Sequence, residues 1–98
     1  MAEGGLRAKV IEPDGRTVVL RDEQWDHIRA GHPEMARYER VIMETITHPD
    51  DRRDDPRPGR KRYFGVGKGP NRWLRVIVDF GDDPGWVVTA FGHDEEPS

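Results

Sequence analysis

The chain contains no cysteine, only one serine (Ser98) and no long apolar run. Without cysteine there can be no disulfide, no thiol nucleophile and no thiolate-bound metal. A lone serine in the last position gives Ser/His/Asp catalysis little basis. No apolar stretch approaches the roughly 18 residues that a membrane span needs, and residues 1–10 lack the apolar region of a signal peptide. We therefore expect a soluble protein, most simply cytoplasmic, with no membrane partner.

The length of 98 residues predicts a single domain, with an ordered core over about residues 7–93. Hydrophobic residues make up 34% of the chain, enough for a small core but not for a second one. Charged residues make up 36%, against about 25% in typical domains, which predicts a heavily ionised surface.

The positive charge is concentrated in one segment. Residues 57–75 carry seven cations and no acid; the whole chain sums to −3, so the remainder sums to −10. Such a segment suits contact with phosphates, and aromatic rings among the cations suit stacking on unpaired bases. The predicted nucleic-acid-binding residues are Arg60, Lys61, Arg62, Lys68, Arg72 and Trp73. The alternative is a solvated loop whose charges only keep the domain soluble.

The first half of the chain predicts a hairpin followed by two helices. Two β-prone runs, 7–12 and 17–21, flank a Pro-Asp-Gly-Arg turn. A first helix over 22–31 begins with Asp22 as its cap and ends at a glycine. A second helix over 33–47 has apolar residues at three- and four-residue spacing and ends before His-Pro.

The second half predicts a polar connector and then an antiparallel meander of about three strands. Residues 50–60 offer no core-forming side chain, whereas 61–66, 72–80 and 86–93 are β-prone. The connections between these runs are too short for parallel crossovers. The fold class is therefore α+β, with one sheet and helices packed on one of its faces.

Two polar residues interrupt the apolar pattern of the last strands. If 72–80 and 86–93 pair, alternation places Arg75 and Thr89 on one face, opposite the face of Val88 and Ala90. A guanidinium and a hydroxyl on one face could hold a phosphodiester, with Tyr63 on the neighbouring strand. Each also has a plain structural explanation, because Thr is a good strand former and an Arg stem can cover a sheet.

Four histidines are candidates for proton transfer, because imidazole titrates near neutrality. His27, beside an apolar helix face, is the strongest, although it could be a packing residue. His32 could be a helix cap, His48 a helix terminator and His93 a solvated residue near a chain end. His27 and His32 are five positions apart across a Gly-His-Pro break, which does not fit a helical ligand pair. We expect no metal and no cofactor.

The order of these motifs resembles a known nuclease superfamily. The motifs are WDHI (25–28), HPE (32–34), VIMETI (41–46), HPD (48–50), a strand around Tyr63, LRVIV (74–78) and VVTAF (87–91). Together they resemble the phage- and toxin-type nucleases of the barnase–EndoU–colicin–RelE (BECR) fold superfamily, over roughly residues 18–92. The resemblance implies metal-free RNA cleavage and an antitoxin or immunity protein as partner. It implies a helix-borne His in His27, a strand-borne cation in Arg75 and a last-strand hydroxyl in Thr89, assisted by His32 and Tyr63.

The sequence therefore predicts a bacterial, toxin- or phage-effector-like endoribonuclease that cleaves RNA through attack of the 2′-hydroxyl. His27 would transfer a proton, Arg75 and Thr89 would bind the phosphate, and His32 or Tyr63 would make the second transfer. The alternative is a module that binds protein or nucleic acid without turnover. A third interpretation is metal-assisted hydrolysis through His27, His32 and Glu34.

Overall fold

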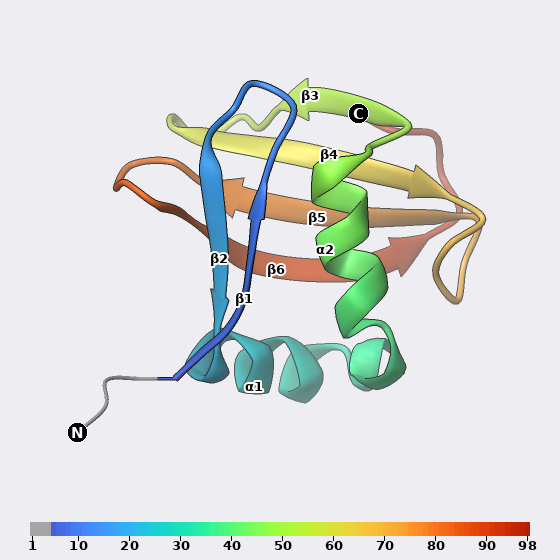
Figure 1. The fold of residues 1–98 in the computed structure, drawn as a ribbon. Helices are drawn as coiled ribbons and strands as arrows, with labels where there is room; N and C mark the ends of the chain where they lie inside the picture. The colour runs from blue at the N-terminus through green and yellow to red at the C-terminus, as the bar shows by residue number, and fades with distance from the viewer. Residues whose placement is uncertain (1–4) are drawn as a thin grey trace.

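The computed structural model describes residues 5–98; residues 1–4, at the start of the segment before the predicted core, lie outside this range. The elements are β1 (Leu6–Ile11), β2 (Thr17–Arg21), α1 (Asp22–Gly31), the 3-10 helix η1 (Pro33–Arg37), α2 (Glu39–Thr47), β3 (Asp51–Asp54), β4 (Arg60–Val66), β5 (Trp73–Asp79) and β6 (Gly85–His93) (Figure 1). No helix within the described range is long and apolar enough to cross a bilayer.

All six strands belong to one mixed sheet with the order β1-β2-β6-β5-β4-β3. Neighbouring strands are antiparallel except β2 and β6, which pair in parallel around Val18 and Val19. The α+β class, the hairpin and the two α-helices are confirmed. The expectation of about three strands, all antiparallel, was wrong in part. The helical layer lies between β2 and β6 in the chain, and it provides the long crossover that a parallel pair requires.

Strand β3 lies in the segment that was expected to be a polar connector. Its four residues pair only with β4, so it is an edge strand. Its side chains are charged on both faces of the sheet. Asp54 forms an ion pair with Lys61, with 3.0 Å between a carboxylate oxygen and Nζ. Ladder hydrogen bonds and charge pairs therefore hold this strand, and hydrophobic alternation could not have revealed it.

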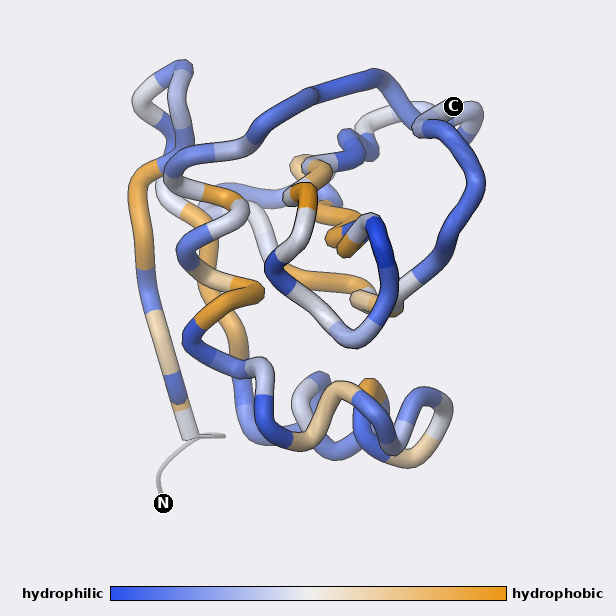
Figure 2. Tube along the Cα trace, turned by 90° about the vertical axis from the view of Figure 1, so that its right-hand side faces the viewer, coloured by the Kyte–Doolittle hydropathy of each residue, from blue (hydrophilic) through white to orange (hydrophobic). Residues whose placement is uncertain are grey.

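The core lies between the helices and one face of the sheet. In Figure 1, α2 crosses in front of the sheet while α1 lies along its lower edge, and in Figure 2 apolar stretches of α2 and the strands turn inward. The fully buried side chains include Leu20, Ile28, Ile42, Ile46, Leu74, Val76 and Val78. The predicted apolar stripe of the second helix is confirmed by the burial of Ile42, Met43, Thr45 and Ile46.

Two details of the helices differ from expectation. Asp22 is the first residue of α1 rather than its cap, and its carboxylate accepts a hydrogen bond from Arg7 at 3.0 Å. The expected second helix is divided at Tyr38 into η1 and α2, because the chain turns there before α2 packs on the sheet.

A β-bulge in β6 sets which residues face away from the helices. Ile77 pairs with Thr89 but Val78 pairs with Val87, so Val88 is the extra residue. The side-chain amide of Gln24 in α1 donates to the carbonyl oxygens of Val88 at 3.1 Å and Val87 at 3.4 Å. The bulge is thus held by α1, and it puts Val87 rather than Val88 in the core.

Candidate functional site

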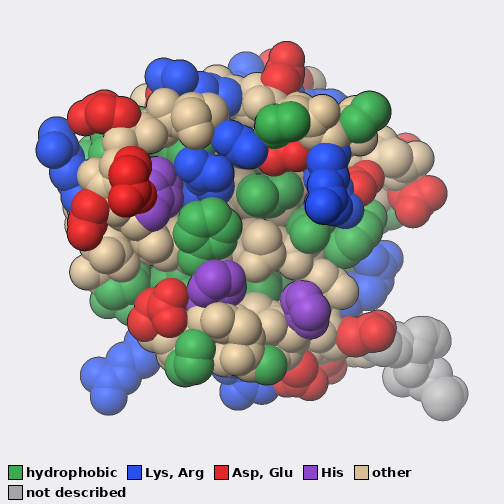
Figure 3. Space-filling view, turned by 180° about the vertical axis from the view of Figure 1, so that it is seen from behind, with side chains coloured by type: hydrophobic (Ala, Val, Ile, Leu, Met, Phe, Trp, Pro, Cys, Tyr) green, Lys and Arg blue, Asp and Glu red, His purple; other side chains and the backbone are tan. Residues whose placement is uncertain are grey.

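The face of the sheet turned away from α2 gathers the residues that could perform chemistry. Strand register places on it Arg62 and Phe64 of β4, Trp73, Arg75 and Ile77 of β5, and Thr89, Phe91 and His93 of β6. We call this surface the open face; Figure 3 shows cationic, hydrophobic and histidine side chains together on this side of the molecule. The prediction that Arg75 and Thr89 share a face is confirmed.

Arg75 lies at the centre of the open face between two aromatic rings. Its guanidinium carbon is 5.2 Å from the ring centre of Phe64 and 5.4 Å from that of Phe91. Within residues 5–98, it is the one cation that is not exposed and yet has no carboxylate oxygen within 4.0 Å of its nitrogens. Burial lowers its pKa, and the nearby Arg62 adds to the effect. A half-buried guanidinium without a counter-ion is suited to an anionic ligand.

Three buried side-chain nitrogens lack a hydrogen-bond partner in the part of the chain that the structure describes. They are Nε1 of Trp73, Nε of Arg75 and Nε2 of His93. All three side chains belong to the open face, where Trp73 and His93 are direct cross-strand neighbours. Buried polar groups in folded proteins are nearly always satisfied, so a cluster of such atoms on one face indicates a site for a ligand with oxygen acceptors.

His32 borders this cluster from the junction of α1 and η1. Its ring stacks on Phe91 with 5.2 Å between ring centres and an interplanar angle of 29°. Its Nδ1 lies 3.6 Å from a carboxylate oxygen of Glu34, and its side chain remains 37% exposed. Phe91 thus has both the accessible His32 imidazole and the Arg75 guanidinium as neighbours.

His27 is exposed on α1 and lies along the same border. Gln24, one helical turn before it, bonds the carbonyls of Val87 and Val88, while His32, after it, stacks on Phe91. Residues three apart share a side of a helix, so His27 lies on the same side of α1 as Gln24, whose side chain reaches β6. No other side chain holds the His27 ring by a hydrogen bond or ion pair within residues 5–98.

Tyr63 does not belong to this site, and its predicted role is corrected. It faces the core, is fully buried, and its hydroxyl donates to Glu12 Oε1 at 2.6 Å. Glu12 also accepts bonds from Arg16 and Arg52. Burial alone would raise the Glu12 pKa, but the bonds from Tyr63 and Arg16 lower it to about 2. The phenol therefore ties the first hairpin to β4 and cannot reach an RNA on the open face.

The substitution Tyr63→Phe tests this separation. It removes one hydrogen bond to a buried carboxylate, so we expect the free energy of unfolding to fall by about 1.5–3 kcal/mol. We expect RNA affinity and cleavage by the folded fraction to change less than about twofold, because the open face is untouched. Urea unfolding and a cleavage assay check the two parts, and a loss of cleavage without a loss of stability would return Tyr63 to the site.

The predicted nucleic-acid-binding residues are divided between surfaces. Arg60 and Arg62 share the open-face side but are paired with Asp79 at 3.0 Å and Asp55 at 2.8 Å. Trp73 lies on the open face, whereas Lys61 points to the other side, paired with Asp54. Arg72 is exposed at the loop before β5. Alternation along β4 explains this division, because successive side chains of a strand point to opposite faces.

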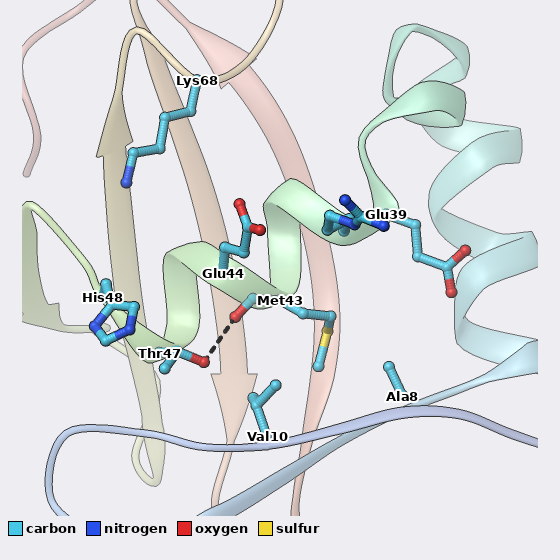
Figure 4. A pocket seen from close by; sticks show the side chains of 9 residues that line it. Ala8, Val10, Glu39, Met43, Glu44, Thr47, His48 and Lys68 are labelled. Atoms are coloured by element: carbon cyan, nitrogen blue, oxygen red, sulfur yellow. Dashed lines mark hydrogen bonds between the residues drawn. The ribbon is translucent and has the colours of Figure 1, made fainter.

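Lys68 lies away from the open face, at a groove of about 670 Å³ between β1 and α2. Figure 4 shows Lys68 and His48 over one end of this groove, with Val10, Met43 and Ala8 along its floor. Glu39, Arg40 and Glu44 also line it, so its rim carries charges of both signs. This mixture does not indicate a phosphate site.

His93 was expected to be solvated near a chain end, but it is nearly buried on the open face. Its ring centre lies 5.9 Å from that of Phe64 and 6.0 Å from that of Phe91, and its side chain is only 9% exposed. Burial lowers its pKa, and Arg75 lowers it further, so a neutral ring is favoured. The same alternation that grouped Thr89 with Arg75 would have placed His93 on this face.

Comparisons with known proteins give no match to this chain. No protein-family model matches the sequence, and no curated protein and no solved structure matches the chain. Within residues 5–98, no three His, Asp or Glu side chains come together in an arrangement that could hold a metal ion. The open face itself carries imidazole, guanidinium and hydroxyl groups, in His93, Arg75 and Thr89.

Proposed function

We propose that the protein is a metal-independent endoribonuclease that binds single-stranded RNA across the open face. The observation that carries the proposal is Arg75, a half-buried guanidinium that, among residues 5–98, has no carboxylate partner and an unsatisfied Nε. Phosphate oxygens would supply the missing acceptors, and the planar guanidinium can bind two of them at once. The surrounding aromatic rings offer surfaces for unpaired bases.

The reaction would be an internal transesterification. One imidazole takes the proton from a ribose 2′-hydroxyl, whose oxygen attacks the adjacent phosphorus. The bond from phosphorus to the 5′-oxygen breaks, and the second imidazole gives that oxygen a proton, leaving a 2′,3′-cyclic phosphate. Arg75 and the Thr89 hydroxyl would stabilise the negative charge that grows on the phosphoryl oxygens. His27 and His32 are the two imidazoles, because Tyr63 is excluded by its burial.

Replacing either histidine tests the mechanism. We expect His27→Ala and His32→Ala each to lower the rate of cleavage by about 10²-fold, the usual contribution of one proton-transfer group. His48→Ala is the matched control, because His48 is also exposed but lies at the groove beside α2. Gel analysis of end-labelled RNA in the presence of a chelator measures the rate and identifies the cyclic phosphate product.

Other outcomes would favour the competing functions. Cleavage that disappears with chelator would support the metal-assisted reaction, and cleavage of DNA would exclude the 2′-hydroxyl as nucleophile. Salt-sensitive RNA binding by the wild type with no product from varied RNAs would identify a binding module instead of a nuclease. Unchanged cleavage by His27→Ala would overturn the mechanism with His27 and His32 as the two proton-transfer groups.

A further inference from the structure

The acidic segment that follows β6, residues 94–98, folds back toward the basic side of the sheet. Although this segment lies beyond the ordered core expected over about residues 7–93, Pro97 is buried, and Arg62 donates hydrogen bonds to the carbonyl oxygen and hydroxyl of Ser98. In Figure 2 the chain end marked C lies on the opposite side of the sheet from α2. The segment is therefore docked beside the open face, with Pro97 and Arg62 as its anchors.

Its three consecutive acids face the cations of this side. Asp94 accepts a hydrogen bond from the backbone N–H of Arg72 at 3.0 Å. A carboxylate oxygen of Glu95 lies 3.9 Å from Nδ1 of His93, and one of Glu96 lies 4.0 Å from the Arg72 guanidinium. Glu95 is also near enough to Arg75 to favour its charged form. If RNA phosphates bind Arg72 and Arg75, as the proposed function requires, these carboxylates occupy part of the same surface.

We infer that residues 94–98 act as an autoinhibitory segment, whose carboxylates compete with RNA phosphates for the open face. The inference rests on the proposed function, because it concerns the same site. The side chains of Glu95 and Glu96 are 87% and 77% exposed. The contact of Glu95 with the His93 ring, whose neutral form is favoured, and the ion pair of Glu96 with Arg72 are therefore both weak. A polyanion that makes several phosphate contacts can therefore displace them while Asp94 and Pro97 keep the segment attached. The segment would favour long single strands over mononucleotides.

The test is the double variant Glu95→Gln/Glu96→Gln, which keeps Pro97 and the Asp94 bond. Its affinity is measured by fluorescence anisotropy with a 2′-O-methyl RNA oligomer, which binds but cannot be cleaved. We expect a Kd about tenfold lower than that of the wild type at low salt, with the gain shrinking as salt screens the charges. The matched control is Asp82→Asn/Asp83→Asn, which removes two exposed carboxylates from the loop at the other end of β6.

The outcomes separate the two proposals. An equal gain in the control variant would attribute the effect to net charge and overturn the autoinhibitory role. Equal Kd values for the wild type and the Glu95/Glu96 variant would also overturn it, while the RNA-binding function would stand. Absence of RNA binding by the wild type and both variants would overturn the proposed function, and the inference with it.

Discussion

Arg75→Gln should lower kcat/KM for RNA cleavage by about 10³-fold and leave the fold nearly as stable as before. Loss of one donor to a developing oxyanion lowers catalysis by about 10²–10³-fold, and loss of a charged guanidinium beside a reacting phosphate by more. The stability of the fold depends little on Arg75, because its charge is half-buried with no carboxylate partner in the described part of the chain. The variant loses the contacts of the guanidinium with Phe64 and Phe91, but it also removes the desolvation cost of a partly buried charge, so the two effects offset each other.

The control for this prediction is Arg40→Gln, which removes the same charge from an exposed Arg at the groove between β1 and α2. We expect its kcat/KM to stay within about threefold of wild type, because distant exposed charges are screened. Arg75→Lys should recover only part of the activity, because an ammonium keeps the charge but loses the two-pronged geometry. Full activity of Arg75→Gln at unchanged stability would remove the open face from the mechanism.

The parts of the site that follow from alternation within a strand could be predicted from the sequence, whereas those that depend on contacts between distant residues could not. Arg75 and Thr89 were placed together by alternation in neighbouring strands, and the structure confirms it. The same alternation placed Val88 with Ala90 on the opposite face, and this prediction was wrong, because the buried residue is Val87. The bulge depends on Gln24, more than 60 positions earlier in the chain, whose amide bonds the carbonyls at the bulge. The alternation of side chains in a β-strand has a period of two residues, and a tertiary contact of this kind cannot be read from it.

The misplacement of Tyr63 has a similar physical cause. A tyrosine next to a basic run is expected to face solvent, but its partner Glu12 lies 51 positions away in the first hairpin. A buried polar group is stable only with such a partner, and the sequence does not show the pairing. The basic segment was likewise recognised as a charge pattern. Its division into paired cations and the unpaired Arg75 depended on acids of other strands, such as Asp55 and Asp79.

The open face therefore differs from the rest of the described surface in its buried side-chain nitrogens that have no hydrogen-bond partner. Elsewhere in the described part of the chain, partly buried cations have a carboxylate within reach, as Arg52 does with Asp14. On the open face, a guanidinium, an indole N–H and an imidazole nitrogen are held among aromatic rings with no acceptor. Native structures tolerate such groups mainly where a ligand completes them, which is why we assign the function to this face and not to the larger grooves.

Glu12→Gln should lower the free energy of unfolding by about 2–3 kcal/mol at pH 7, and this difference should vanish in acid. The Glu12 pKa is about 2 in the folded protein, against 4.5 for an unperturbed group. A carboxylate whose pKa is lowered on folding stabilises the fold above its unfolded pKa. The contribution is complete above about pH 5 and is lost as the pH falls from 4.5 toward 2. A pKa shift of this size corresponds to about 3 kcal/mol of folding stability. The expected value is somewhat smaller, because Arg16 and Arg52 are partly exposed and solvent screens their charges.

Urea unfolding of the wild type and of Glu12→Gln at intervals from pH 2 to pH 7 measures this difference. Glu44→Gln is the matched control, because Glu44 is an exposed glutamate on α2. Its stability should follow that of the wild type throughout. A gap between wild type and Glu12→Gln that persists undiminished at pH 2 would show that lost packing, and not the ionised carboxylate, is responsible. A gap that closes as the pH falls from 4.5 toward 2 would show that the charged form of Glu12 holds the first hairpin against Tyr63 on the core side of the sheet.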